Sequence, residues 1–275
     1  MFKLAAAALV CALLLTLAAW RREGARWQRF AVASFAFFAL ITASFWILSP
    51  DGTARTVQAD ASGTLMLQIV QGRGAVVLPF GLAALAAAWL WPKRRLAAML
   101  GPLAYNALMT VEAIRAQFTP LATPERWIYV ALHGFWAITL AVYCSGLERR
   151  RPNGIAIGTG IAIGAIPALI GMTLYLAPLS LIGSLAGAAP TALLLHAAHA
   201  FGASLAALGL TSLSCWTGHS RRASRGVCLM AAAILASLAM AADYWPAAVI
   251  TLAWGLVHLL SRPKAFPASE PASQT

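Results

Sequence analysis

The ionisable side chains with the potential for chemistry in this 275-residue chain lie within long apolar segments. Glu112 stands three residues before Arg115 and seven after Tyr105, so these three share one stripe of a helix. His196 and His199 stand about one helical turn apart and therefore also share a face. Ionisable groups inside a membrane are costly and usually face the interior of a helix bundle, which makes these residues candidates for function.

Depth along the predicted helices groups these residues further. When each segment crosses the membrane, His133 and His196 both lie about six residues, roughly 9 Å, below its outer surface. Glu112 lies about one turn nearer that surface, and Asp243 stands in a connection just above it. The predicted polar intramembrane site consists of these residues: Glu112, Arg115, His133, His196, His199 and Asp243.

Three chemistries fit this predicted site. Imidazole and carboxylate groups bind zinc or copper, and the candidate metal ligands are Glu112, His133, His196 and His199. Two histidines on different helices at one depth, His133 facing His196 or His199, are also suited to bind a b-type haem. The same groups are equally suited to pass protons during coupled transport. A structural alternative is that the histidines are neutral and hydrogen-bonded across helices.

The elements that must position these residues are membrane-spanning helices. Hydrophobic residues make up 61% of the chain and charged residues 10%, with a mean hydropathy of +0.77, which excludes a water-soluble domain. A hydrocarbon core of about 30 Å needs about 20 apolar residues per helix. We therefore predict an all-α, polytopic transmembrane bundle of about nine spans, between eight and ten. The nine are Phe2–Trp20, Phe30–Ser49, Val76–Trp91, Leu96–Ile114, Trp127–Leu147, Gly154–Leu176, Pro190–Trp216, Val227–Ala242 and Trp245–Leu260.

Basic residues determine the predicted orientation. Most of the 20 Lys and Arg residues lie in alternate connections between the predicted spans. Because basic residues resist translocation across the membrane, we place these connections in the cytoplasm. The amino terminus is then outside and the carboxyl terminus inside, as in a multi-pass protein of a bacterial inner membrane. Topology and anionic lipid explain these clusters, so the net charge of +12 does not indicate nucleic-acid binding. The clusters are Arg21, Arg22, Arg26 and Arg29, Lys93–Arg95, Arg149–Arg151, Arg221, Arg222 and Arg225, and Arg262 with Lys264.

The residues outside the spans predict no second folded domain. Residues 1–264 form one transmembrane domain, and residues 265–275, rich in Pro, Ala and Ser, form a disordered cytoplasmic tail. Between the second and third spans, Pro50–Gly52 indicates a turn and Thr64–Val70 a segment lying along the outer membrane surface. Trp46 is one of several tryptophans expected in an interfacial aromatic belt at the span ends.

The sixth span is unusually rich in glycine. Two GxxxG pairs allow a neighbouring helix to approach closely: Gly154 with Gly158, and Gly160 with Gly164. Pro167 frees a carbonyl one turn earlier and, together with Gly171, would break the helix as in transporters with discontinuous helices.

The remaining metal-ligating residues do not suggest a site. The four cysteines, Cys11, Cys144, Cys215 and Cys228, are far apart, so their spacing predicts neither a redox pair nor a zinc site. His258 lies near the inner end of the last span, too far across the bilayer to join the predicted polar site.

The chain contains no HExxH, GxSxG, glycine-rich phosphate loop or aspartate-rich diphosphate motif, so an enzyme is not indicated. We expect a permease, or the membrane subunit of a transport system, for a small solute or ion. The predicted polar site would be reached from the outer face, and another membrane subunit is a conceivable partner. The alternatives are a haem- or metal-binding membrane redox subunit and a non-catalytic assembly or scaffold protein.

Overall fold

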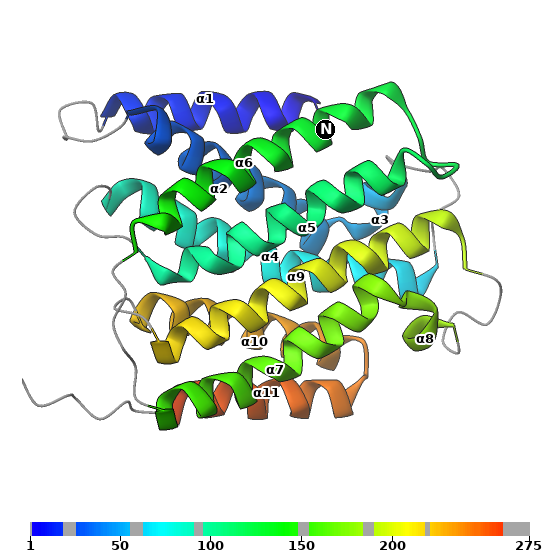
Figure 1. Ribbon diagram of the computed structural model, residues 1–275. Coiled ribbons are helices and arrows are strands. Elements are labelled where there is room, and N and C mark those ends of the chain that lie inside the picture. The colour runs from blue at the N-terminus through cyan, green and yellow to red at the C-terminus, as the bar shows by residue number, and fades with distance from the viewer. Residues whose placement is uncertain are drawn as a thin grey trace, which may run out of the picture.

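The structure is a computed structural model that describes residues 2–18, 26–55, 63–90, 96–147, 154–183, 190–217 and 221–260. Every regular element within these ranges is a helix, and the long helices run side by side (Figure 1). The predicted tail, residues 265–275, lies outside the described residues. The elements are α1 (Phe2–Ala18), α2 (Arg26–Leu48), α3 (Pro50–Arg55), α4 (Thr64–Leu90), η1 (Ala97–Met99), α5 (Leu100–Ala116), η2 (Pro124–Arg126), α6 (Trp127–Ser145), α7 (Gly154–Leu176), α8 (Pro178–Ile182), α9 (Ala192–Thr217), α10 (Arg221–Ala241) and α11 (Trp245–Leu260).

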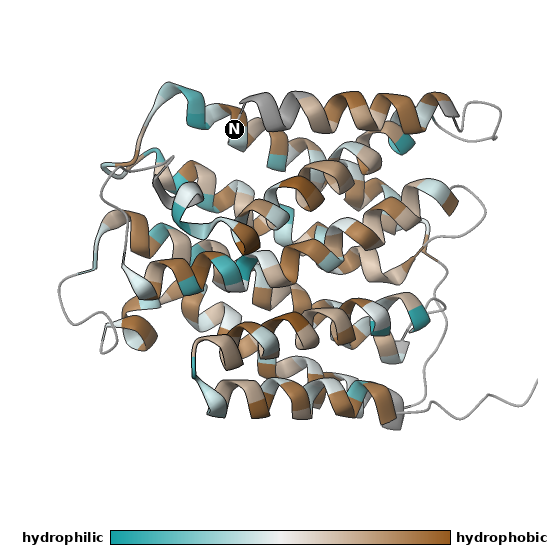
Figure 2. Ribbon diagram, turned by 180° about the vertical axis from the view of Figure 1, so that it is seen from behind, coloured by the Kyte–Doolittle hydropathy of each residue, from teal (hydrophilic) through white to brown (hydrophobic). Residues whose placement is uncertain are grey.

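Seven of these segments are long and apolar enough to cross a membrane, so the chain is an integral membrane protein with a helical bundle. Hydrophobic residues predominate along the helices (Figure 2). Helices α1 and α11 are apolar but have only 17 and 16 residues, about 25 Å of helix against a hydrocarbon core of about 30 Å. The predicted helical bundle is confirmed, whereas nine spans and the orientation stay predictions.

The bundle is arranged around α4, α5 and α9, which contact one another. Helix α6 packs on α5 and α2, α7 packs on α9, and α10 packs on α4 and α9. Helix α1 packs on α2 and α11 on α10, at opposite edges of the bundle (Figure 1). We call the end where α5 ends and α9 begins the Glu112 end, and the end where α9 meets α10 the His258 end.

Helix α4 corrects the predicted third span. It runs without interruption from Thr64 to Leu90, so Thr64–Val70 is its first part and not a separate segment on the membrane surface. The helix continues through Gly72 and Gly74, and both glycines allow neighbouring helices to pack closely against it. A Cβ at Gly74, for example, would lie 3.0 Å from the backbone oxygen of Ala43 in α2. The predicted turn at Pro50–Gly52 is also wrong, since these residues begin the short helix α3.

Close packing of α7 on α9 explains three glycines of the sixth predicted span, Gly160, Gly164 and Gly171. A Cβ at Gly164 would lie 2.8 Å from the backbone oxygen of Gly209, and one at Gly202 would lie 2.6 Å from that of Gly171. Helix α7 continues through Pro167 and Gly171, so the expected break is not present, and Gly171 instead allows the two backbones to meet. Gly158 has open space beside it and takes no part in this packing.

Candidate functional site

A cavity of about 420 Å³ lies at the Glu112 end, within the size range of small-molecule sites, roughly 300–1,000 Å³. Helices α2, α4, α5, α6 and α9 and the short η2 supply its walls. Most of the residues that line the cavity are apolar or aromatic, including Trp46 and Met66. The charged and imidazole-bearing lining residues are Arg73, Glu125, Arg126, His133 and His196.

Arg73 enters the cavity from the interior of α4. Its guanidinium carbon lies 4.1 Å from the centroid of the Trp46 ring, a cation–π contact. Its Nε and Nη2 donate hydrogen bonds to the Tyr105 hydroxyl over 3.2 and 2.6 Å. Trp46 lies two residues from the end of α2, near a span end as predicted, but it is only 7% exposed and faces this guanidinium inside the bundle.

The positive charge of Arg73 is not neutralised within the described part of the chain. Its contacts there are the neutral Trp46, Tyr105 and Met109, and no described carboxylate forms an ion pair with it. Its Nη1 atom has no hydrogen-bond partner among the same residues. An unpaired arginine inside a spanning helix is costly, and such a residue usually has a function. This guanidinium is therefore available to an anionic ligand.

Glu112 forms a second polar group beside the cavity. Its Oε1 atom accepts a hydrogen bond from His196 Nδ1 over 2.8 Å, and Arg115 Nε lies 3.3 Å from its Oε2. The carboxylate is 3% exposed, whereas Arg115 is 43% and His196 is 23% exposed. Helices α5 and α9 are therefore adjacent, as the grouping of these residues requires, and Glu112 joins a cavity-lining histidine to a more exposed arginine.

His133 lies in the wall of the same cavity, on α6. Its Nδ1 atom lies 2.8 Å from Asn106 Oδ1, while the Asn106 amide nitrogen donates to the Pro102 carbonyl over 2.8 Å. The amide oxygen therefore faces the imidazole, and His133 Nδ1–H donates to it. The ring also forms T-shaped contacts with Tyr105 and Trp136, at centroid distances of 5.9 and 5.7 Å, which help to fix its orientation.

Two residues of the predicted site lie elsewhere. His199 Nδ1 donates to the backbone oxygen of Tyr175 over 2.7 Å, which satisfies a carbonyl in the last turn of α7, and His199 does not line the cavity. Asp243 is exposed in the turn between α10 and α11, where its carboxylate accepts a hydrogen bond from Trp245 Nε1 over 2.9 Å. Among the described residues, no hydrogen bond or ion pair joins Asp243 to Glu112, His133, His196 or His199.

The four candidate metal ligands of the predicted site do not converge. Among the described residues, the one group of three or more ligand atoms that come together consists of Cys215, Cys228 and His258, at the His258 end. A metal or haem site shared by His133 and His199 does not match the cavity, since His199 turns towards α7.

Arg73 is absent from the predicted site because two glycines flank it and indicate a connection between spans. A signal was nevertheless present: Met66, Val70 and Arg73 follow one another at spacings of four and three residues, and all three line the cavity from one face of α4. This spacing indicates that the helix begins near Thr64, which places Arg73 inside a span.

The cysteine pair was missed because Cys215 and Cys228 are 13 positions apart in the sequence. The hairpin of α10 and α11 contains the signal that relates Cys228 to His258. Both residues lie fifteen positions from Asp243 in its turn, so antiparallel helices place them at one height.

No protein-family model, curated protein or solved structure is significantly similar to this chain. The function is therefore inferred from the geometry of the two groups of polar residues.

Proposed function

We propose that this chain is a permease, or the membrane subunit of a transport system, for a small organic anion with an apolar part. The observation that carries the proposal is the guanidinium of Arg73, which is held by neutral groups inside a spanning helix and lines the cavity. Carboxylate and phosphate groups match the donors of arginine in both charge and geometry.

The composition of the cavity supports an anionic and partly apolar solute. Arg73 and Arg126 bring two positive charges to its lining, against the single carboxylate of Glu125. The aromatic and aliphatic lining, with Phe38, Met66 and Leu193 among it, offers contacts to a short hydrocarbon group.

The proposed role of the Glu112–His196 pair is proton handling. His196 lines the cavity and bonds to a buried carboxylate whose second oxygen, Oε2, has no aligned hydrogen bond. A proton taken up from the cavity by His196 can therefore be shared with Glu112, which would couple solute movement to a proton gradient.

The proposed setting is a bacterial inner membrane, with the Glu112 end outside. We infer it from the positive-inside rule: α4 ends and α5 begins at the His258 end, and the sequence between these helices contains Lys93–Arg95. Anionic lipid at these connections and a further membrane subunit are the proposed partners.

Binding of a defined probe tests the anion site. Titration of the purified protein in detergent with 4-methyl-2-oxopentanoate, and separately with its neutral amide, should show tighter binding of the carboxylate. Arg73→Gln should weaken carboxylate binding about 10- to 100-fold, because it removes a charged hydrogen bond. Arg222→Gln is the matched control, since this exposed arginine lies at the other end of the bundle.

Equal affinity for the acid and the amide, or an unchanged affinity in Arg73→Gln, would refute the anion site. A Soret band in the purified protein that disappears in His133→Ala would instead favour the haem-binding alternative.

Gradient-driven uptake into proteoliposomes tests the proton role separately. Glu112→Gln should retain binding of 4-methyl-2-oxopentanoate and lose uptake driven by a pH gradient. Unchanged uptake in this variant would refute proton handling by Glu112 and leave the anion site standing.

A further inference from the structure

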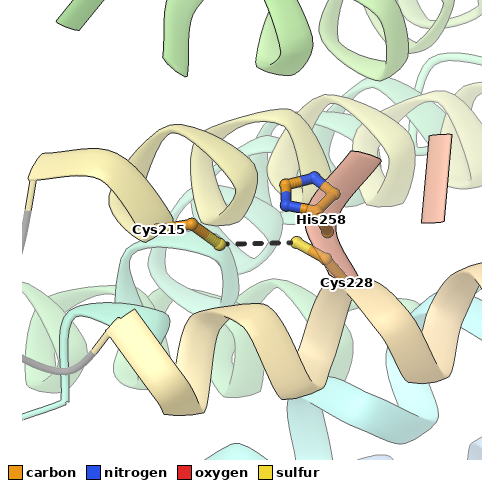
Figure 3. Close-up of side chains that lie close together, drawn as sticks. All are labelled: Cys215, Cys228 and His258. Carbon is orange, nitrogen blue, oxygen red and sulfur yellow. Dashed lines mark hydrogen bonds between the residues drawn. The ribbon is translucent and has the colours of Figure 1, made fainter. Parts of the chain in front are cut away.

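Two thiols and an imidazole meet at the His258 end, far from the cavity. Cys215 from α9, Cys228 from α10 and His258 from α11 point towards one another (Figure 3). The two Sγ atoms lie 4.0 Å apart, and these sulfurs and one nitrogen of the ring lie within 4.8 Å of one another. All three residues are buried, with exposed fractions of 6%, 0% and 1%.

One nitrogen of His258 is already engaged, and the other is not. Nε2 lies 3.1 Å from Ser212 Oγ, whereas the buried Nδ1 has no hydrogen-bond partner. The ring is further held by Trp254, whose ring centroid lies 4.6 Å from its own. A buried polar atom normally has a partner, and a histidine that ligates a metal usually has its other nitrogen fixed by a neighbour, as Ser212 does here.

We propose that Cys215, Cys228 and His258 bind a thiophilic transition-metal ion, with Zn²⁺ as the ion that fits best. Two Zn–S bonds of about 2.3 Å at a tetrahedral angle separate the sulfurs by about 3.8 Å, close to the 4.0 Å observed. The ligand set of two thiolates and one imidazole is typical of zinc and copper and unlike the oxygen ligands of Mg²⁺ or Ca²⁺.

Charge favours Zn²⁺ over Cu⁺. Binding requires both thiols to lose their protons, so Zn²⁺ with two thiolates and a neutral imidazole forms a complex without net charge. Cu⁺ with the same ligands would have a net charge of −1, which costs more in a buried site. The three protein ligands leave the fourth tetrahedral position open to a water molecule or another exogenous ligand.

The surrounding helices hold the three ligands in place. Ser214 Oγ donates to Ser224 Oγ over 2.7 Å, which joins α9 to α10 beside the two cysteines. A Cβ at Gly255 would lie 2.9 Å from Ala232 Cβ, so α11 approaches α10 closely just before His258. This arrangement is independent of the proposed transport function, because none of these residues lines the cavity.

Co²⁺ binding tests the site with a spectroscopic signature. The full-length protein, purified with a reductant and stripped of metal, should bind Co²⁺ with thiolate-to-cobalt charge-transfer absorption, and Zn²⁺ should displace it. Cys215→Ser, Cys228→Ser and His258→Gln should each reduce this absorption or weaken binding at least about tenfold. The double variant Cys11→Ser, Cys144→Ser is the matched control and should bind Co²⁺ like the parent, since neither residue belongs to the cluster.

Three results would overturn the proposal. The first is parent protein that binds no more Co²⁺ than the Cys215→Ser variant, with both eluting as folded species. The second is displacement of Co²⁺ by Cu⁺ but not by Zn²⁺, which would refute the choice of ion. The third is an intact mass two hydrogens short with a Cys215–Cys228 cross-linked peptide, which would make the pair a disulfide instead.

Discussion

The two ends of this bundle use histidine in different surroundings. At the Glu112 end, His196 lines a cavity, is partly exposed and bonds to a carboxylate. At the His258 end, His258 is 1% exposed, faces two thiols and, within the described part of the chain, bonds to one side chain, the hydroxyl of Ser212. In our proposals, the partner of each histidine and its access to solvent distinguish the site for protons and anions from the site for a thiophilic metal ion.

The two ends also differ in charge. The cavity contains arginines with an excess of positive charge, and its Arg73 has no carboxylate partner in the described part of the chain. The cysteine cluster has no charged side chain among its three ligands until its thiols lose their protons. We therefore expect the first to select anions and the second to select cations.

The largest effect is expected from a substitution in α9 that disrupts both the cavity and the cysteine cluster, because α9 contributes residues to both. Gly202→Leu places a side chain against the backbone of α7, because even a Cβ would lie 2.6 Å from both Gly171 O and Tyr175 N. We expect a loss of roughly 3 kcal/mol in the free energy of unfolding, together with loss of both anion and Co²⁺ binding. Unfolding in a denaturing detergent titration measures the first quantity.

Gly158→Leu is the control for this prediction, because open space surrounds that position on α7. A Gly202→Leu protein as stable as Gly158→Leu would show that the close contact of α7 and α9 is not required.

The next effect should separate the two ends. Arg73→Gln is expected to weaken 4-methyl-2-oxopentanoate binding about 10- to 100-fold and to leave Co²⁺ binding unchanged, since Arg73 and the cysteine cluster share no contacts among the described residues. Cys228→Ser should do the reverse. Titration of both variants with both probes checks this, and a change in both affinities in either variant would mean that the two ends are coupled.

A smaller effect should sharpen the description of the metal site. Ser212→Ala removes the hydroxyl that bonds to His258 Nε2, so the imidazole is less well fixed and Co²⁺ should bind about 10- to 100-fold more weakly, with its absorption spectrum retained. Ser237→Ala, which alters an exposed serine of α10, should have no effect. Equal Co²⁺ affinities in the two variants would contradict the positioning role of Ser212.

The smallest effect is expected at Asp243, where sequence and structure disagree. Asp243→Asn should change the free energy of unfolding by less than about 0.5 kcal/mol, because the residue is exposed in a turn. The affinities for 4-methyl-2-oxopentanoate and Co²⁺ should stay unchanged. A clear loss of anion binding in Asp243→Asn would return this residue to the site.

Spacing along a single helix was the most informative sequence signal for the site. Glu112 and Arg115 pair as their three-residue separation predicts. Glu112 and His196 were grouped at depths about one helical turn apart, and their side chains are in contact. Arg73 was not predicted, because its neighbouring glycines resemble chain breakers until α2 and α9 are seen to pack against them. His199 was grouped with His196 by spacing, yet it serves the carbonyl of Tyr175.

The apolar composition and segment lengths by themselves determined that this protein is a helical membrane bundle, because a backbone in lipid must satisfy its own hydrogen bonds. Only the tertiary structure decided which polar residues meet: Arg73 with Tyr105, and Cys215 with Cys228 and His258. The reason is that contacts between helices depend on which faces pack together, and small residues such as Gly202 settle that packing through shape. Hydrophobicity places helices in the bilayer, and close packing within the bundle then assembles the sites.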